Sequence, residues 1–181
     1  MSWLLEPGVV RLFMGLIYKP DSPTADLLKM FEEELGEIDF ESEELHFDHS
    51  SYYSKEMGEG LLRKILTFQK LIRRTDIVEV KTFTNKLEKV FSYGGDGENR
   101  TINIDPGYIA QEHVILATGK GYSHRPYLGN GVYADLTLIY IKDEYTTLQW
   151  TYPDYGSKEM RELFKELRTQ YVTQLKKESN I

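Results

Sequence analysis

The segment from Val9 to Tyr18 constrains the fold more than any other part of the sequence. It is a nearly continuous apolar run in which Arg11 is the one charged residue. A half-buried strand alternates apolar and polar side chains, whereas a strand buried on both faces is apolar throughout. The run is much shorter than the roughly 20 residues that a membrane-spanning helix needs. We therefore expect residues 9–18 to form a central strand of a sheet.

A helical pattern follows this strand. Apolar side chains recur at helical spacing behind a Ser-Pro pair, and the pattern closes at a glycine: Ser22, Pro23, Leu27, Leu28, Phe31, Leu35 and Gly36. Serine favours the N-cap, proline the first helical position and glycine the end of a helix. We expect a helix that Ser22 caps and Gly36 ends.

The segment between residues 38 and 91 contains one ambiguity. Residues 38–40 and 45–47 are short extended pieces in acidic surroundings. Residues 61–72 suit either a helix or a strand, and we favour a strand because of the order of the surrounding elements. Thr75 is expected to cap a helix that continues to Phe91.

Extended segments dominate the second half of the chain. A loop at residues 94–97 precedes five of them, at 101–104, 113–118, 125–128, 132–141 and 146–150. Gly129-Asn130-Gly131 predicts a hairpin, since these residues tolerate positive φ. Ser157 is expected to cap a last helix, whose apolar stripe is Leu163, Phe164, Leu167, Tyr171 and Leu175.

The first two thirds of the predicted elements follow the order β-α-β-β-α-β, which is typical of the ferredoxin-like fold. We expect one α+β domain over residues 1–181. It comprises a ferredoxin-like βαββαβ core (9–105), an antiparallel extension (106–155) and a C-terminal helix (157–178). The expected architecture is a sandwich in which helices cover one face of a mostly antiparallel sheet.

Composition narrows the class of protein. Hydrophobic residues make up 40% of the 181 residues, which is enough for a packed core and excludes a disordered chain. Cysteine is absent, which excludes disulfides, thiol nucleophiles and cysteine-based metal sites. The first residues lack the basic and apolar regions of a signal peptide, so we expect a cytoplasmic protein that does not enter a membrane.

Charge is segregated along the chain, whose formal net charge is −7. Residues 26–59 hold 12 acidic and 2 basic residues, and residues 61–90 hold 8 basic and 3 acidic residues. The two segments could form separate solvated faces of opposite sign. Alternatively, the basic segment could provide a surface for an anion beside an acidic one.

Signatures of nucleotide hydrolysis and metal binding are absent or weak. A Walker A phosphate loop needs two glycines at fixed spacing before Lys and Ser or Thr, and Gly119-Lys120 lacks that context. His46 and Asp48 alternate on a predicted strand, and with His49 they could ligate a metal. A polar edge strand with solvated histidines explains the same residues. The sequence identifies no cofactor.

The richest group of candidate functional residues lies between residues 103 and 155. Lys120, His124 and Arg125 are three hydrogen-bond donors close together, a combination that suits a phosphate or a carboxylate. Nearby tyrosines could stack on a base or sugar, and an aspartate could partner His124 in acid–base chemistry. These additional candidates are Asp105, Tyr108, Tyr127, Tyr133 and Asp135.

A structural interpretation of the same segment stays open. Tyrosine favours strands, and Asp-Pro-Gly-Tyr at 105–108 and Pro-Asp-Tyr at 153–155 are common turn sequences. Trp150, Tyr152 and Tyr155 are expected to pack against the last helix rather than to bind a ligand. Seven of the 13 tyrosines nevertheless lie within residues 120–155, so the excess of tyrosine is local.

Several stretches together resemble a prokaryotic family, the domain of unknown function 4416 family. The matching residues are Phe13–Tyr18, Tyr52–Gly58, Lys81–Glu88, Asn103–Tyr108, His124–Gly129 and Trp150–Tyr155. Pro126 departs from the family pattern, in which we expect an aliphatic residue. Some members carry the label GTP-binding protein, which the missing phosphate loop does not support here. The resemblance implies no established activity.

The resemblance draws attention to one face of the helix that contains residues 81–88. Thr84, Asn85 and Glu88 lie on that face, and Lys81 lies one turn before Asn85. This polar face could meet the turn that holds His124 and Arg125, with Lys81 and Asn85 as ligand-binding residues. It could equally be a solvent-facing surface.

Three functions are therefore open. The first is binding or processing of a phosphorylated ligand, a nucleotide or an RNA end. Lys120 and Arg125 would hold phosphate, Tyr108 and Tyr127 would flank the ligand, and His124 with Asp105 would transfer protons. The second is a non-catalytic interaction module, such as a homodimer. The third is a metal-dependent hydrolase that uses His46 and Asp48.

Overall fold

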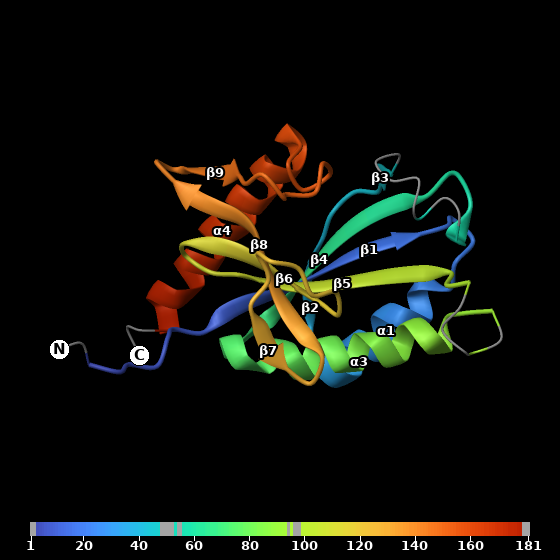
Figure 1. Cartoon of the computed structure of the whole chain (residues 1–181), viewed down its shortest axis with the longest axis horizontal. Coiled ribbons are helices and arrows are strands. Elements are labelled where there is room, and N and C mark those ends of the chain that lie inside the picture. The colour runs from blue at the N-terminus through green and yellow to red at the C-terminus, as the bar shows by residue number, and fades with distance from the viewer. Residues whose placement is uncertain (1–2, 48–52, 54–55, 94, 96–98, 179–181) are drawn as a thin grey trace.

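The computed structural model describes residues 3–47, 53, 56–93, 95 and 99–178, and its centre is one antiparallel sheet (Figure 1). The nine strands are β1 (Val10–Tyr18), β2 (Ile38–Glu41), β3 (Leu45–His46), β4 (Leu62–Ile72), β5 (Ile102–Ile109), β6 (His113–Thr118), β7 (Tyr127–Gly129), β8 (Val132–Ile141) and β9 (Glu144–Thr147). The helices are α1 (Thr24–Leu35), α3 (Ile77–Val90) and α4 (Lys158–Glu178). Seven strands follow the order β2-β4-β1-β5-β6-β8-β7, while β3 pairs with β4 and β9 with β8.

Strand β1 is central, as its apolar sequence predicts. It pairs with β4 along one edge and with β5 along the other. Leu12, Met14 and Leu16 point into one hydrophobic core, and Phe13 points into a second core on the opposite face. Both faces of the strand are buried, so the usual alternation with polar residues is missing.

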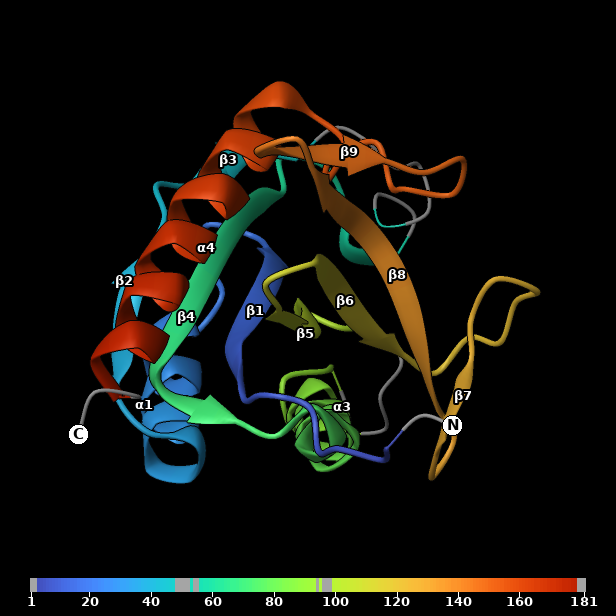
Figure 2. The same cartoon turned by 90° about the vertical axis from the view of Figure 1, so that its left-hand side faces the viewer.

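The two cores correspond to helices on both faces of the sheet. Helices α1 and α3 lie on one face, and α4 lies on the other (Figures 1 and 2). The expectation that helices cover one face is therefore wrong for α4. Phe164 of α4 packs edge-on against Phe13, with ring centroids 4.9 Å apart. An apolar stripe predicts that a helix is buried, but it does not identify the face against which the helix packs.

The local predictions succeed at most element boundaries. Residues 62–72 form a strand, Gly36 ends α1 with φ +97°, and the Ser157 hydroxyl accepts the N–H of Met160 at 3.1 Å. The hairpin at residues 129–131 is present, with positive φ at all three positions. Among the described residues, no helix has the length and apolarity to cross a bilayer.

The predicted N-caps of α1 and α3, Ser22 and Thr75, are wrong. The Ser22 hydroxyl donates to the carbonyl of Thr101 at 3.1 Å instead of capping α1. Thr75 lies inside a short 3₁₀ turn before α3, where the Asp76 carboxylate accepts the backbone N–H of Arg73 at 3.0 Å. The Ser22 hydroxyl is thus used by a contact distant in sequence, and Asp76 rather than Thr75 satisfies a backbone N–H before α3.

The segment 105–108 belongs to β5 and is not a turn. Each of its residues pairs with β1, Asp105 opposite Gly15 and Pro106 opposite Met14. Strand β9 begins at Glu144 and ends at Thr147. The prediction of an extended segment at 146–150 is therefore wrong for residues 148–150. At residues 105–108, pairing with β1 overrides the preference of Pro106-Gly107 for a turn.

Candidate functional site

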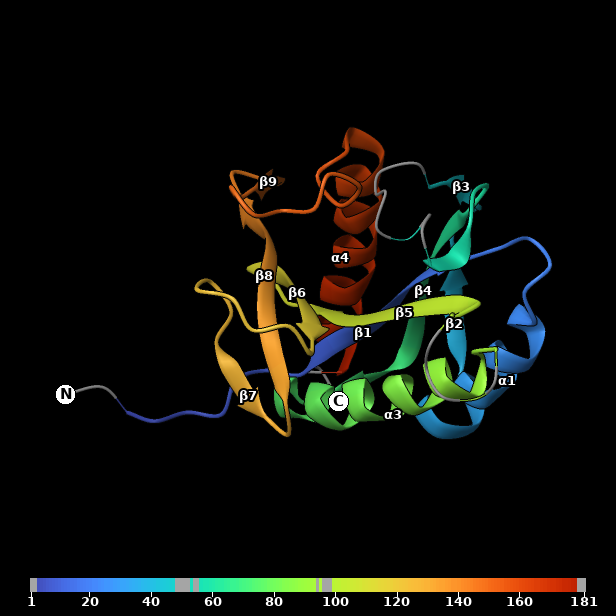
Figure 3. The same cartoon turned by 45° about the vertical axis from the view of Figure 1, so that its right-hand side comes forward.

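The candidate site lies where β5 and β6 separate. The two strands pair only at Gly107 with Leu116, Tyr108 with Ile115 and Ile109 with Val114 (Figure 3). Backbone groups alternate in direction along a strand, and Ile104 bonds away from β1, so Pro106 also presents its nitrogen toward β6. Proline has no N–H to donate, and the pairing stops at this residue. The separation leaves an opening between the two strands.

Side chains from helix α3 satisfy the exposed edge of β5. The Glu88 carboxylate accepts the N–H of Ile104 at 2.7 Å, and the Lys81 amine donates to the carbonyl of Ile104 at 3.2 Å. These two contacts replace hydrogen bonds that a neighbouring strand would supply. Helix α3 therefore closes one side of the opening without filling it.

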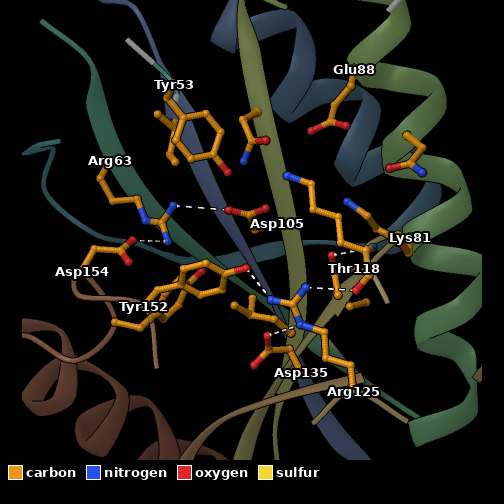
Figure 4. Close-up of a pocket in the computed structure, with 18 of the residues that line it drawn as sticks. Tyr53, Arg63, Lys81, Glu88, Asp105, Thr118, Arg125, Asp135, Tyr152 and Asp154 are labelled. Carbon is orange, nitrogen blue, oxygen red and sulfur yellow. Dashed lines mark hydrogen bonds and ion pairs between the residues drawn. The ribbon is translucent and has the colours of Figure 1, made fainter. Parts of the chain in front are cut away.

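The opening is a cavity of about 670 Å³, which lies within the usual size range of small-molecule sites. Figure 4 shows its two walls, one from α3 with Lys81 and Glu88 and one with Tyr53, Arg63 and Tyr152. Asp105 lies between them, and Arg125 with Asp135 lies at one end.

Lys81 is the distinctive cation of the cavity. Only 7% of the residue is exposed, yet its amine forms no ion pair with any carboxylate of the described residues. A lysine amine has three donors, and the carbonyl of Ile104 uses one of them. Burial raises the pKa of Glu88, and the nearby charges of Lys81 and Arg100 oppose that rise.

Arg100 orients a buried amide at the cavity wall. It forms a two-pronged ion pair with Glu56, at 2.7 and 2.9 Å, and donates to the side-chain oxygen of Asn103 at 3.0 Å. Because the oxygen of Asn103 faces Arg100, its NH₂ group is directed elsewhere. That nitrogen is buried and has no hydrogen-bond partner among the residues described.

Arg63 occupies the opposite wall, held by two carboxylates. Its guanidinium lies 2.8 Å from Asp154, 3.5 Å from Asp105 and 4.6 Å from the centre of the Tyr155 ring. The Tyr155 hydroxyl is buried and has no hydrogen-bond partner in the described part of the chain. It lies against Gly15, where a Cβ atom would be 2.5 Å away.

Each of the three nitrogens of Arg125 has a partner within the protein. Its three nitrogens donate to Asp135 at 2.7 Å, to the carbonyl of Lys120 at 3.0 Å and to the Tyr152 hydroxyl at 2.7 Å. His124 lies 3.7 Å from Asp135 and stacks on Trp150, with ring centroids 4.7 Å apart. The arginine and histidine therefore build one end of the cavity.

The structure brings together seven of the ten residues that the sequence singled out. The cavity is lined by Lys81, Asn85, Asp105, Lys120, His124, Arg125 and Asp135. Within this group, the ion-pair contact of His124 is with Asp135, whereas Asp105 pairs with Arg63. The polar face of the helix at residues 81–88 thus meets the turn at 124–125 across one cavity.

The other three predicted residues lie outside the cavity. Tyr108 packs in the core beneath α3, near His113. Tyr127 and Tyr133 contact each other on β7 and β8, with ring centroids 5.1 Å apart. Side chains alternate between the two faces of a strand, so residues three positions apart point to opposite faces. Asp105 and Tyr108 of β5 are therefore on opposite faces of the sheet.

Sequence reasoning missed several residues of the cavity: Tyr53, Arg63, Arg100, Asn103, Tyr152, Asp154 and Tyr155. Tyr53, Asn103 and the 152–155 segment lie in stretches that match the family, so that resemblance was a usable signal. Tyr155 does pack against Phe164 of α4 as expected, and it also lines the cavity. Arg63 and Arg100 carry no local signal, because their ion pairs join residues distant in sequence.

The predicted metal site receives no structural support. His46 is exposed on β3, while Asp48 and His49 lie outside the described residues. Within the described ranges, no three His, Asp or Glu side chains are grouped as a metal would require.

Fold and cavity together define an α+β protein with a polar, partly enclosed cleft. A family model described as a domain of unknown function (DUF4416) matches residues 8–171, and the chain belongs to this family. No curated protein and no solved structure matches the chain.

Proposed function

We propose that the cavity binds a small phosphorylated ligand, such as a nucleotide or the phosphorylated end of an RNA. The observation that carries the proposal is the buried Lys81 amine, which lacks an ion-pair partner among the described residues. Glu88 acts on Lys81 only through its charge, and a buried charge without a counter-ion in direct contact destabilises the folded protein. A phosphate would supply that counter-ion and accept the remaining hydrogen bonds.

The other unpartnered groups support an acceptor-rich ligand. The NH₂ group of Asn103 and the hydroxyl of Tyr155 are buried hydrogen-bond donors of residues that line the cavity. We assign the phosphate to Lys81 and Asn103, with Asn85 beside them on α3. Tyr53 and Tyr152 replace Tyr108 and Tyr127 as the aromatic residues that flank the ligand.

The proposed roles of Arg125 and Lys120 also change. Arg125 already donates from all three nitrogens to partners within the protein, so we propose that it positions Tyr152 and Asp135. Lys120 lines the same cavity, and we propose it as a second cation for the ligand.

A thermal-shift screen tests the proposal. Nucleoside monophosphates and sugar phosphates should raise the melting temperature of the protein, because a ligand that binds only the folded state stabilises it. The matched non-phosphorylated nucleosides and sugars should produce no shift. Equal shifts from both sets, or none from either, would contradict the proposal.

We also propose that the chain is one domain built on a ferredoxin-like core. The order β2-β4-β1-β5, with antiparallel pairing throughout, supports this topology. Helices α1 and α3 follow β1 and β4, as the βαββαβ order requires.

A further inference from the structure

We infer that the ligand carries hydroxyl groups as well as a phosphate, so that its class is a sugar phosphate, either free or as part of a nucleotide. This inference rests on the proposed function, because it concerns the end of the ligand opposite the phosphate. It follows from the carboxylate of Asp105, which the proposed phosphate contacts do not use.

Asp105 is the most exposed of the four carboxylates that line the cavity. Its side chain is 28% exposed, and its contact with Arg63 is long, at 3.5 Å. Asp154, the other carboxylate on Arg63, is more buried and closer, at 2.8 Å. Asp154 therefore holds the guanidinium, and Asp105 keeps lone pairs directed at the cavity.

The negative charge of Asp105 acts on three tyrosines that line the cavity. Burial raises the pKa of Tyr53, Tyr152 and Tyr155, and the negative charge of Asp105 adds to this effect at all three. A second phosphate or a carboxylate at this place would face that negative charge. A hydroxyl group would instead donate to it, and a charged acceptor makes a strong hydrogen bond.

The surrounding aromatic side chains fit the same class of ligand. Tyr53 and Tyr152 flank Asp105 in Figure 4, and Phe47 packs edge-on against Tyr53 at 5.7 Å. Sugars present apolar C–H groups between their hydroxyls, which favour contact with an aromatic ring. Lysine and asparagine for phosphate, carboxylate for hydroxyls and tyrosine for the ring thus meet in one cavity.

Titration calorimetry on the full chain tests the inference with two probes. Ribose 5-phosphate has hydroxyl groups, and ethyl phosphate is a phosphate monoester without them. We expect the wild-type protein to bind ribose 5-phosphate at least roughly tenfold more tightly, since one charge-assisted hydrogen bond accounts for such a factor. In Asp105→Asn, the affinity for ribose 5-phosphate should exceed that for ethyl phosphate by only about one- to threefold.

The outcomes separate the two proposals. Asp143→Asn, an exposed aspartate in the β8–β9 turn, is the matched control and should keep the wild-type ratio. Continued binding of ethyl phosphate by Asp105→Asn shows that the site is folded. An unchanged ratio in Asp105→Asn would overturn this inference and leave the phosphate site standing. Failure of both probes to bind the wild-type protein would overturn the phosphate site as well.

Discussion

At the scale of single residues, the cavity depends on a glycine in the central strand. Gly15 lies opposite Asp105 in the β1–β5 register, and its missing side chain leaves room for the Tyr155 hydroxyl and the Arg63 guanidinium. Gly15 pairs with Ile65 of β4 and Asp105 of β5 in regular strand register. The requirement for glycine is therefore steric rather than conformational.

Gly15→Ala tests this account. A Cβ atom would lie 2.5 Å from the Tyr155 hydroxyl, so we expect destabilisation of about 1–3 kcal/mol in urea unfolding. The double variant with Tyr155→Phe removes the hydroxyl and should recover most of that loss. Gly8→Ala, where no atom lies within 4 Å, is the control. Equal stabilities of Gly15→Ala and Gly8→Ala would refute the steric role.

At the scale of elements, α3 acts as a substitute for a strand. Its residues Lys81 and Glu88, two turns apart, bind the carbonyl and the N–H of Ile104, beyond the point where Pro106 ends the pairing with β6. The sequence predicts this polar helix face but not its partner. Only the register of β5 against β1 shows which backbone groups remain to be satisfied.

Glu88→Gln tests how much the burial of the ionised Glu88 carboxylate destabilises the folded protein. Because burial raises the pKa of Glu88, the folded state binds its proton more tightly than the unfolded state does. The resulting stability is present at low pH and is lost as the pH rises through the folded-state pKa. Glutamine keeps the acceptor for Ile104 but cannot ionise.

We therefore expect the melting temperature of Glu88→Gln, relative to wild type, to be higher at pH 7 than at pH 4. Glu79→Gln, on the same helix, is the control and should show no such change. A relative melting temperature that falls between pH 4 and pH 7 would mean that the ionised carboxylate stabilises α3.

At the scale of the whole molecule, ion pairs join part of the segregated charge of the sequence. Acidic residues of β2 and the loop after it meet basic residues of β4 and β1. Lys64 lies 3.3 Å from Glu41, and Arg11 lies 2.6 Å from Asp39. Arg63 and Lys81 are buried at the cavity. Part of the basic segment is therefore used in ion pairs and at the candidate site, while Lys70, Lys86 and Lys89 are exposed.

This distribution limits the size of the ligand. Long nucleic acids bind through many phosphate contacts on a broad basic surface, and the chain has a net charge of −7. We expect the affinity for a 5′-phosphorylated RNA of about twelve nucleotides to be within roughly threefold of that for a mononucleotide. A steep rise of affinity with length, measured by fluorescence anisotropy, would point to an extended surface instead.

The sequence was sufficient for the local elements and for part of the site. Three local patterns predict local structure correctly: the apolar run of β1, the apolar stripe of α4, and the glycines at 129 and 131 in the hairpin. Lys81, Asn85, His124 and Arg125 could be selected because they cluster in sequence or on one helix face. Arg63, Arg100 and Asn103 could not, since their positions depend on strand register and on ion pairs between distant segments.

The central claim is that the Lys81 amine binds the phosphate of the ligand, and calorimetry with ribose 5-phosphate tests it most directly. Methionine preserves most of the length of the side chain but not its charge. Lys81→Met should lower the affinity at least roughly tenfold while the melting temperature of the protein is retained. Lys86→Met, an exposed lysine on the same helix, should bind like the wild type. Equal affinities of the two variants would contradict the account.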